Sequence, residues 1–210
     1  MADKTPAQAW REMREGNDRF VTGDPLHPSQ GIGDRDRLTA GQHPKAILFG
    51  CSDSRVAAEI IFDQGLGDLF VVRTAGQTID SAVLGSIEFA VAVLNVPLIA
   101  ILGHDSCGAV SATIKALDKL ELPGGYITDV VERVAPSILA GRSEGLSTPE
   151  EFEARHVKET AARLLERSRT IAEAVEAGKL GIVGLTYSLA EGKVLLREAI
   201  GDVDDTPATV

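Results

Sequence analysis

The sequence is poor in cysteine and in aromatic residues. Of its 210 residues only two are cysteine, and aromatic residues make up 4%. Two cysteines can form at most one disulfide bond, so a disulfide-rich secreted scaffold is excluded. A cysteine that a cytosolic protein retains is more often a metal ligand or a catalytic group. The two cysteines are therefore the first candidates for chemistry.

Positive charge is also scarce, since 21 Lys and Arg stand against 31 Asp and Glu, a formal net charge of −10. A nucleic-acid-binding protein needs clustered Lys and Arg to neutralise phosphates, so we expect no nucleic acid as partner. The charge gives no reason to expect an anionic membrane surface either. An uncharged small substrate would be unaffected by it.

Long hydrophobic runs are missing too: none approaches the roughly 20 residues that a helix needs to span a bilayer. The N-terminal segment holds Asp3, Lys4, Arg11 and Glu15, which is not typical of a signal peptide. Hydrophobic residues make up 44%, as in globular proteins. We therefore expect a cytoplasmic protein with no membrane partner and a single domain over residues 1–210.

Strand-like and helix-like segments alternate along most of the chain. Residues 1–43 are expected to form an N-terminal helix and a loop-like arm, 44–200 an α/β core, and 201–210 a loose acidic tail. Thr5 as N-cap, Pro6 at the first helical position and Gln8 predict a capping box at the start of the first helix. Further helices are expected over 56–62, 79–94, 109–114, 128–140 and 148–178, with Ser52 and Ser54 in the turn that opens the first of them.

Four buried-strand runs, at 46–49, 69–73, 97–102 and 180–185, lie between these helices. Their alternation with helices predicts a mostly parallel sheet with right-handed crossovers. We expect the strand order 2-1-3-4, in which the first and third strands are neighbours that diverge at a switch point. Residues 194–196, after a turn at Glu191-Gly192, are a candidate antiparallel edge strand. The fold class is therefore α/β.

Two short motifs each follow a buried strand and precede a helix. Gly-Cys-Ser-Asp-Ser-Arg at 50–55 follows the first strand, and Gly-His-Asp-Ser-Cys-Gly at 103–108 follows the third. Because the carboxyl ends of neighbouring parallel strands meet at one edge of a sheet, we expect the two motifs to converge. The metal-capable residues brought together would be Cys51, Asp53, His104 and Cys107.

Each of these residues also has an ordinary structural explanation. A cysteine at a strand end is often inert, and a histidine after a glycine is often only hydrogen-bonded. Asp53 would suit a helix cap, and Arg55 a solvated charge. The combination favours chemistry, because two cysteines and one histidine form a catalytic zinc set that leaves a fourth position for water or substrate. Cys107 would also begin a helix, which favours its thiolate.

The two motifs together resemble those of the β-class carbonic anhydrases. The similarity covers most of the chain, through Val-Val-Arg at 71–73 and Ile-Glu-Phe-Ala at 87–90 to the last strand. It implies that Cys51, His104 and Cys107 are the ligands of one Zn²⁺ per subunit.

The activity implied by the resemblance is the reversible hydration of carbon dioxide to bicarbonate and a proton. A zinc-bound hydroxide would be the nucleophile, since zinc lowers the pKa of bound water toward about 7. Asp53 is implied to be either a catalytic residue paired with Arg55 or, in a closed state, a fourth zinc ligand. We expect His27, His43 and His156 to be surface residues rather than proton shuttles.

The family has an open and a closed type of site, and we expect the open type. The closed type holds bicarbonate beside a tryptophan, an arginine and a tyrosine. Arg73 and Tyr187 match two of these, but Leu48 stands at the tryptophan position. The positions that match the substrate pocket of the open type are Gln42, Phe70, Phe89 and Gly108, although Phe89 lacks the hydroxyl often found there.

The resemblance also implies a homodimer or tetramer, with N-terminal helices that wrap a partner and an active site at the dimer interface. Residues 79–94 support this independently, because the predicted helix is apolar almost all round and must be buried over most of its surface.

Three other functions fit parts of the pattern. Relatives with the same zinc set hydrolyse carbonyl sulfide or carbon disulfide. A structural zinc module would gather its ligands in close Cys pairs and would lack the Asp-x-Arg sequence. A thiol redox enzyme would be expected to contain Cys-x-x-Cys, which this sequence lacks.

Overall fold

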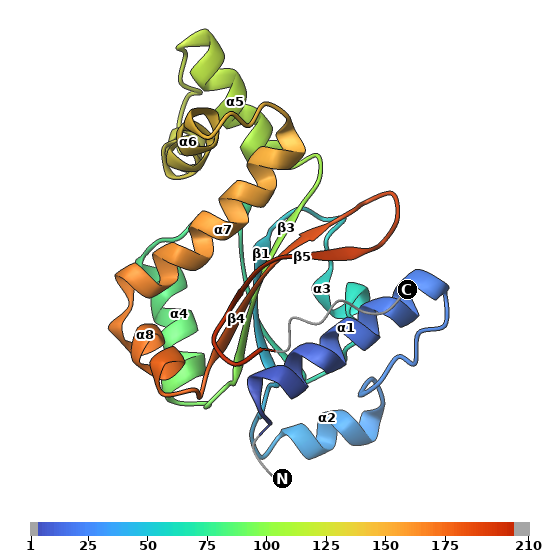
Figure 1. Cartoon of the computed structure of the whole chain (residues 1–210). Coiled ribbons are helices and arrows are strands. Elements are labelled where there is room, and N and C mark those ends of the chain that lie inside the picture. The colour runs from blue at the N-terminus through green and yellow to red at the C-terminus, as the bar shows by residue number, and fades with distance from the viewer. Residues whose placement is uncertain (1–3, 204–210) are drawn as a thin grey trace.

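The structure is a computed structural model that describes residues 4–203, and its centre is a five-stranded sheet (Figure 1). The strand order is β2-β1-β3-β4-β5; the first four strands are parallel, and β5 runs antiparallel to β4. The predicted order and the antiparallel edge strand are confirmed. The strands are β1 Ala46–Cys51, β2 Leu69–Thr74, β3 Leu98–His104, β4 Gly181–Tyr187 and β5 Val194–Ile200.

The three central strands are apolar along their length because both of their faces are covered. Every residue of β1, β3 and β4 is buried. Successive side chains point to opposite faces of a strand. In β1, Ile47 and Phe49 therefore belong to one core, while Ala46 and Leu48 belong to the other. This two-sided burial is typical of parallel sheets.

Helices cover the two faces of the sheet (Figure 1). One face packs against α4 (Ser81–Ala92), α7 (Pro149–Arg167) and α8 (Arg169–Glu176). The other packs against α1 (Pro6–Thr22) and the short α3 (Ala58–Ile61). Beyond the carboxyl end of β3 lie α5 (Gly108–Lys119) and α6 (Ile127–Ser143), which pack on each other. A 3₁₀ turn, η1 (Ala75–Gln77), follows β2.

The N-terminal helix α1 packs on the sheet of its own chain, and the expected wrapping of a partner stays a prediction. The predicted cap is present, because the Thr5 hydroxyl accepts the N–H of Gln8 and the Gln8 side chain accepts the N–H of Thr5. Ala9 and Met13 are 0% exposed in the core beneath the helix. The side chain of Asn17 donates to the carbonyls of Ile61 and Gly192 and so ties α1 to the end of α3 and to the turn before β5.

Residues 22–43 were predicted to be a loop-like arm, but they contain a short helix, α2 (Ile32–Leu38). Asp34 lies in its first turn and accepts the N–H of Gly31 at 3.2 Å, and two arginines lie in its last turn. Both charge placements favour the helix dipole. The helix α3 is shorter than the predicted 56–62 and begins after Ala57, so Ser52 and Ser54 do not cap it.

The single helix predicted over 148–178 is two helices, α7 and α8, because Ser168 is extended (φ −123°, ψ 108°). The Ser168 hydroxyl accepts the N–H of Ile171 and donates to Glu88 of α4 at 2.6 Å. These two hydrogen bonds of the Ser168 hydroxyl offset the helical hydrogen bonds that are lost at the break. The helix predicted over 128–140 is longer, and it continues through Pro136 to Ser143.

Within the described range 4–203, none of the helices has both the length and the apolar character to cross a membrane. The predicted tail lies outside the described residues from position 204 onward.

Candidate metal centre

The two motifs converge at the carboxyl edge of the sheet, as predicted. Neighbouring parallel strands β1 and β3 end at Cys51 and His104, and Cys107 is the N-cap of α5. The ligand atoms of these three residues all lie within 4.8 Å of one another. The residues are 5%, 0% and 2% exposed. Both cysteines are free thiols.

The turn between His104 and Cys107 is fixed by the neighbouring strand. The N–H of Asp105 donates to the carbonyl of Tyr187, and the Asp105 carboxylate accepts the N–H of Leu189. Ser106 then adopts a left-handed conformation (φ 55°), which turns the chain back toward the sheet. This tight turn returns Cys107 to the side of His104.

The histidine presents one ring nitrogen to the cluster. His104 Nδ1 lies 2.7 Å from the carbonyl of Asp105, and since a carbonyl only accepts, Nδ1 carries the proton. His104 Nε2 is buried and has no hydrogen-bond partner among the described residues. An orphaned buried nitrogen is costly, and metal ligation is the usual reason for one held in place through its other nitrogen. Two thiols and this nitrogen are a donor set that suits zinc.

The pKa values of the two thiols suit a shared cation. The neighbouring Cys107 thiol, together with His104 and the N–H of Gly76, lowers the pKa of Cys51 to about 4. The same proximity, with burial, raises the pKa of Cys107. The protein groups therefore stabilise one thiolate and disfavour a second. A bound dication would supply the missing charge, because metal binding releases the protons of its ligands.

Asp53 lies beside the cluster and is held by Arg55. The guanidinium donates from Nε to Oδ1 at 2.9 Å and from Nη2 to Oδ2 at 2.7 Å, a bidentate pair, and the Arg55 N–H adds a third hydrogen bond at 2.9 Å. Asp53 Oδ2 lies 4.0 Å from His104 Nε2. The Arg55 contacts hold the pKa of Asp53 far below its usual range. The carboxylate is thus ionised and fixed next to the metal-capable atoms.

Arg73, on the neighbouring strand β2, holds the backbone of the first motif. Its Nε donates to the carbonyl of Cys51 at 2.8 Å and its Nη2 to the carbonyl of Asp53 at 2.6 Å. The guanidinium of Arg73 is therefore engaged by backbone carbonyls in this structure.

The other two positions compared with the closed type of site lie in the sheet. Leu48 is 1% exposed in the core, and Tyr187 lies opposite His104 in the β3–β4 register.

The predicted pocket residues do not gather at the cluster within one chain, apart from Gly108, the first residue of α5. Gln42 is exposed and precedes β1, at the opposite end of that strand from Cys51. Phe70 pairs with Ile47, four residues before Cys51, a separation of about 13 Å along the strand. Phe70 lies near Phe89, with ring centroids 6.4 Å apart.

Two buried polar residues near the cluster were not predicted. Glu153 of α7 is 3% exposed and accepts the N–H of Cys107 at 2.9 Å. Burial raises its pKa to about 7. His156, expected on the surface, is also 3% exposed. In the sequence both residues look like members of a charged helix, and only the hydrophobic stripe beside them indicates which side of the helix faces inward.

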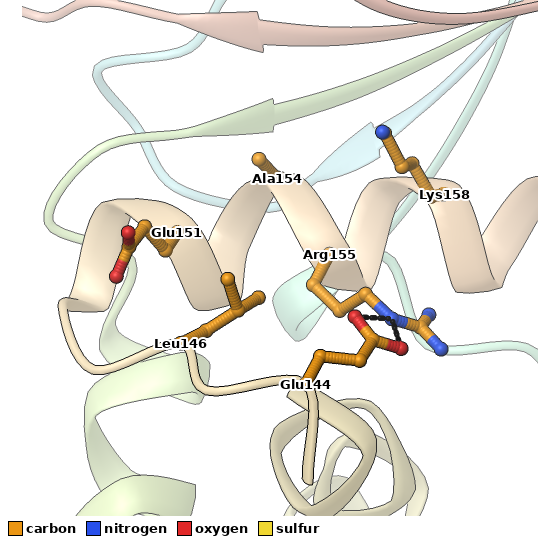
Figure 2. Close-up of a pocket in the computed structure, with 6 residues that line it drawn as sticks. All are labelled: Glu144, Leu146, Glu151, Ala154, Arg155 and Lys158. Atoms are coloured by element: carbon orange, nitrogen blue, oxygen red, sulfur yellow. Dashed lines mark hydrogen bonds and ion pairs between the residues drawn. The ribbon is translucent and has the colours of Figure 1, made fainter. Parts of the chain in front are cut away.

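A surface pocket of about 440 Å³ lies between the end of α6 and the first turns of α7 (Figure 2). Three of its polar side chains are already paired, since Arg155 binds Glu144 and Glu159, and Glu151 accepts the N–H groups of residues 147 and 148. None of the predicted site residues lines it. The residues that do are Glu144, Leu146, Glu151, Ala154, Arg155 and Lys158.

The known proteins that this chain resembles in sequence and in structure are named carbonic anhydrases. A family model described as carbonic anhydrase matches residues 46–194. Carbonic anhydrase 2 of Mycobacterium tuberculosis is 62% identical over 98% of this chain and 99% of its own length. The carbonic anhydrase of Mycolicibacterium smegmatis is also 62% identical, over 98% of this chain and all of its own length.

The structure agrees with the sequences. The β-carbonic anhydrase CcaA superimposes with a TM-score of 0.72 at 26% identity, over 93% of each chain. The match includes the sheet that carries the metal-capable cluster. This chain belongs to the β-class carbonic anhydrases.

Proposed function

We propose that this protein catalyses the zinc-dependent, reversible hydration of carbon dioxide at the cluster of Cys51, His104 and Cys107. The observation that carries the proposal is this buried donor set with the carboxylate of Asp53 fixed beside it. The two thiolates and His104 Nε2 would hold the ion. When bound, zinc supplies an activated water as the nucleophile at neutral pH.

The role we assign to Asp53 is to orient that nucleophile. An ionised carboxylate can only accept hydrogen bonds, so Asp53 would accept a hydrogen bond from the nucleophile and direct the lone pair of the nucleophile at the carbon. The bidentate contact with Arg55 keeps the carboxylate in one orientation. The same contact holds it away from the metal, which favours the open type of site.

The substrate pocket requires a second subunit in our proposal. Gln42, Phe70 and Phe89 cannot reach the cluster of their own chain, because they lie toward the other end of the strands that carry it. Phe89 of α4 and Val93, the C-cap of that helix, are 46% and 60% exposed, so large apolar side chains face outward there. A homodimer that buries this helix would bring the three pocket residues to the partner's cluster. A tetramer would then be a pair of such dimers.

The decisive experiment pairs metal analysis with a stopped-flow assay of carbon dioxide hydration on the same sample. We expect one zinc per subunit and hydration that is lost on zinc removal and restored on its return. Replacing Cys51, His104 or Cys107 by Ala should abolish both zinc binding and hydration activity. Full zinc occupancy in any one of these variants would remove that residue from the ligand set. Carbonyl sulfide and carbon disulfide serve as comparison substrates, and faster turnover of either would redirect the assignment.

A cytoplasmic location remains a prediction, supported by two cysteines that are both free.

A further inference from the structure

Helix α7 carries two buried polar side chains that contact the loops of the two thiol ligands. Glu153 and His156 are three residues apart, so they project from the same side of the helix. Each is 3% exposed. Burying polar groups this deeply is costly unless their hydrogen bonds are made. The partners they have found are the backbones of the metal-capable loops.

The contact of Glu153 is with a ligand residue itself. Its Oε1 accepts the N–H of Cys107 at 2.9 Å. Cys107 is the N-cap of α5, where backbone N–H groups have no partner inside the helix. Glu153 therefore fixes the peptide from which the second thiol projects.

His156 is linked to the thiol of Cys51 through the backbone of Gly76. His156 Nε2 lies 2.8 Å from the carbonyl of Gly76, so Nε2 carries the proton and Nδ1 accepts the hydroxyl of Ser137 at 2.8 Å. Burial lowers the pKa of His156, which keeps the ring neutral, as this arrangement requires. The N–H of Gly76 in turn donates to the sulfur of Cys51 at 3.4 Å.

The intervening peptide has little freedom to move. Gly76 is left-handed (φ 63°), and a Cβ there would lie 2.6 Å from the Cβ of Ala109 on α5. Its backbone is thus confined between α5 on one side and His156 of α7 on the other. A change at His156 would shift the carbonyl of Gly76 and, with it, the N–H that faces the thiol.

We propose that Glu153 and His156 are positioning residues of the metal centre, through which α7 holds the loops of Cys107 and Cys51 at the separation that zinc requires. The proposal rests on the zinc site proposed above. Neither residue touches the metal or the substrate. Outer contacts of this kind typically change metal affinity by about 10- to 100-fold when removed.

The test measures the zinc affinity of the full-length protein by competition with a chelator. Glu153→Met and His156→Leu remove the hydrogen bonds, and we expect each to weaken zinc binding by about 10- to 100-fold. Glu153→Gln and His156→Gln retain an acceptor and a donor at the same reach, and they should keep most of the affinity. The matched control is Thr160→Val, because Thr160 is 2% exposed on the same helix and, among residues 4–203, its hydroxyl bonds only the carbonyl of His156.

A second readout separates positioning from loss of stability. With Co²⁺ in place of zinc, the thiolate-to-metal absorption bands should shift in Glu153→Met and His156→Leu but not in Thr160→Val. Zinc affinities and spectra equal to those of Thr160→Val would overturn the proposal. If circular dichroism shows that apo His156→Leu is unfolded, the Glu153→Met and Glu153→Gln pair decides alone. Absence of zinc binding in the unmodified protein would instead overturn the metal centre itself, and the proposal with it.

Discussion

Arg55 is a surface residue whose guanidinium pairs with a carboxylate beside the buried cluster. Its guanidinium is largely exposed, yet it makes a bidentate contact with Asp53 and reaches the carbonyl of Ser106. Without it, the carboxylate would be unpaired beside a dication, and its best alternative partner would be the metal. We predict that Arg55→Ala retains zinc but loses hydration activity by about 100-fold or more. X-ray absorption would detect the carboxylate oxygen that replaces water at the metal.

Two further variants make this prediction specific. Asp53→Asn should also keep zinc and be slow, but with water still at the metal, because an amide is a poor ligand and misorients the nucleophile. Arg35→Ala is the control, since Arg35 forms an exposed ion pair with Asp36 far from the cluster in sequence. Near-normal hydration rates in Arg55→Ala would reduce Arg55 to a structural charge.

At the scale of residues, the sequence predicted the three metal-capable residues that the structure brings together, and it missed the two buried polar residues of α7. Cys51, His104 and Cys107 stood out because cysteine is scarce and each motif follows an apolar run. Glu153 and His156 did not, because a glutamate and a histidine in a charged helix look the same whether they face water or a buried loop. Their role depends on how α7 is rotated against the sheet end, which is a tertiary property.

Among the connecting segments, the arm after α1 is held by one buried carboxylate. Asp63 is 3% exposed, accepts the N–H groups of Leu26 and His27 at 2.9 Å each, and pairs with Arg19 at 2.7 Å. We predict that Asp63→Ala destabilises the fold by about 2–4 kcal/mol and exposes the arm to proteolysis. Chemical denaturation with limited proteolysis would measure both. The control Asp36→Ala removes only an exposed ion pair and should cost less than about 0.5 kcal/mol.

The effect of Asp63 should depend on pH in one direction. Burial alone would raise the pKa of Asp63, but the N–H groups of Leu26 and His27 and the charge of Arg19 lower it below its usual value. The stabilisation is therefore present above the unfolded pKa of about 4 and is lost as the pH falls through the lower, folded pKa. The gap in unfolding free energy between the unmodified protein and Asp63→Ala should narrow in acid. A constant gap down to low pH would show that the charge is not what stabilises the arm.

Elements were predictable where one physical signal dominated. The strands over 46–49 and 97–102 were found because both of their faces are buried and they read as continuous apolar runs. The break at Ser168 was not, because the stripe of the predicted helix continues across it, and the contact with Glu88 that favours the break comes from a distant element. The helix α2 is short and apolar only at its two ends, Ile32 and Leu38, and such a segment has too little hydrophobic periodicity to detect.

For the whole molecule, the position of Gln42 leads to a complementation test. Gln42→Ala should lower kcat/KM by roughly 5- to 150-fold while zinc stays bound. If Gln42 serves the partner's site, then a mixture of Gln42→Ala and Cys51→Ala subunits contains one intact site in each mixed dimer. We predict that unfolding and refolding the impaired Gln42→Ala variant together with the inactive Cys51→Ala variant restores hydration activity above that of either alone.

The controls for complementation are internal. Mixing His104→Ala with Cys51→Ala should restore nothing, because both changes damage ligand sets, and each site takes all of its ligands from one chain. If the Gln42→Ala mixture also restored nothing although mixed dimers formed, the pocket would not be completed by a partner. An unchanged kcat/KM in Gln42→Ala would remove Gln42 from the pocket altogether.

The overall architecture followed from the order of strands and helices, but the course of the N-terminal helix did not. The capping box of α1 was predicted, whereas its packing on its own sheet depends on Ala9, Met13 and Asn17 matching a surface formed much later in the chain. The division into an arm (1–43), a core (44–200) and a tail (201–210) stays a prediction.

Both cysteines of this protein lie in one buried cluster, so no other residue competes for a thiol-specific reagent. A fluorescent maleimide applied to the folded protein should therefore act as a gauge of metal occupancy. Loaded molecules stay dark because their sulfurs are coordinated and shielded, while molecules that have lost the ion become labelled as the site opens. The dark fraction of this protein, measured in its own band after electrophoresis of a labelled lysate, would then report how completely the proposed metal site is filled, without a substrate.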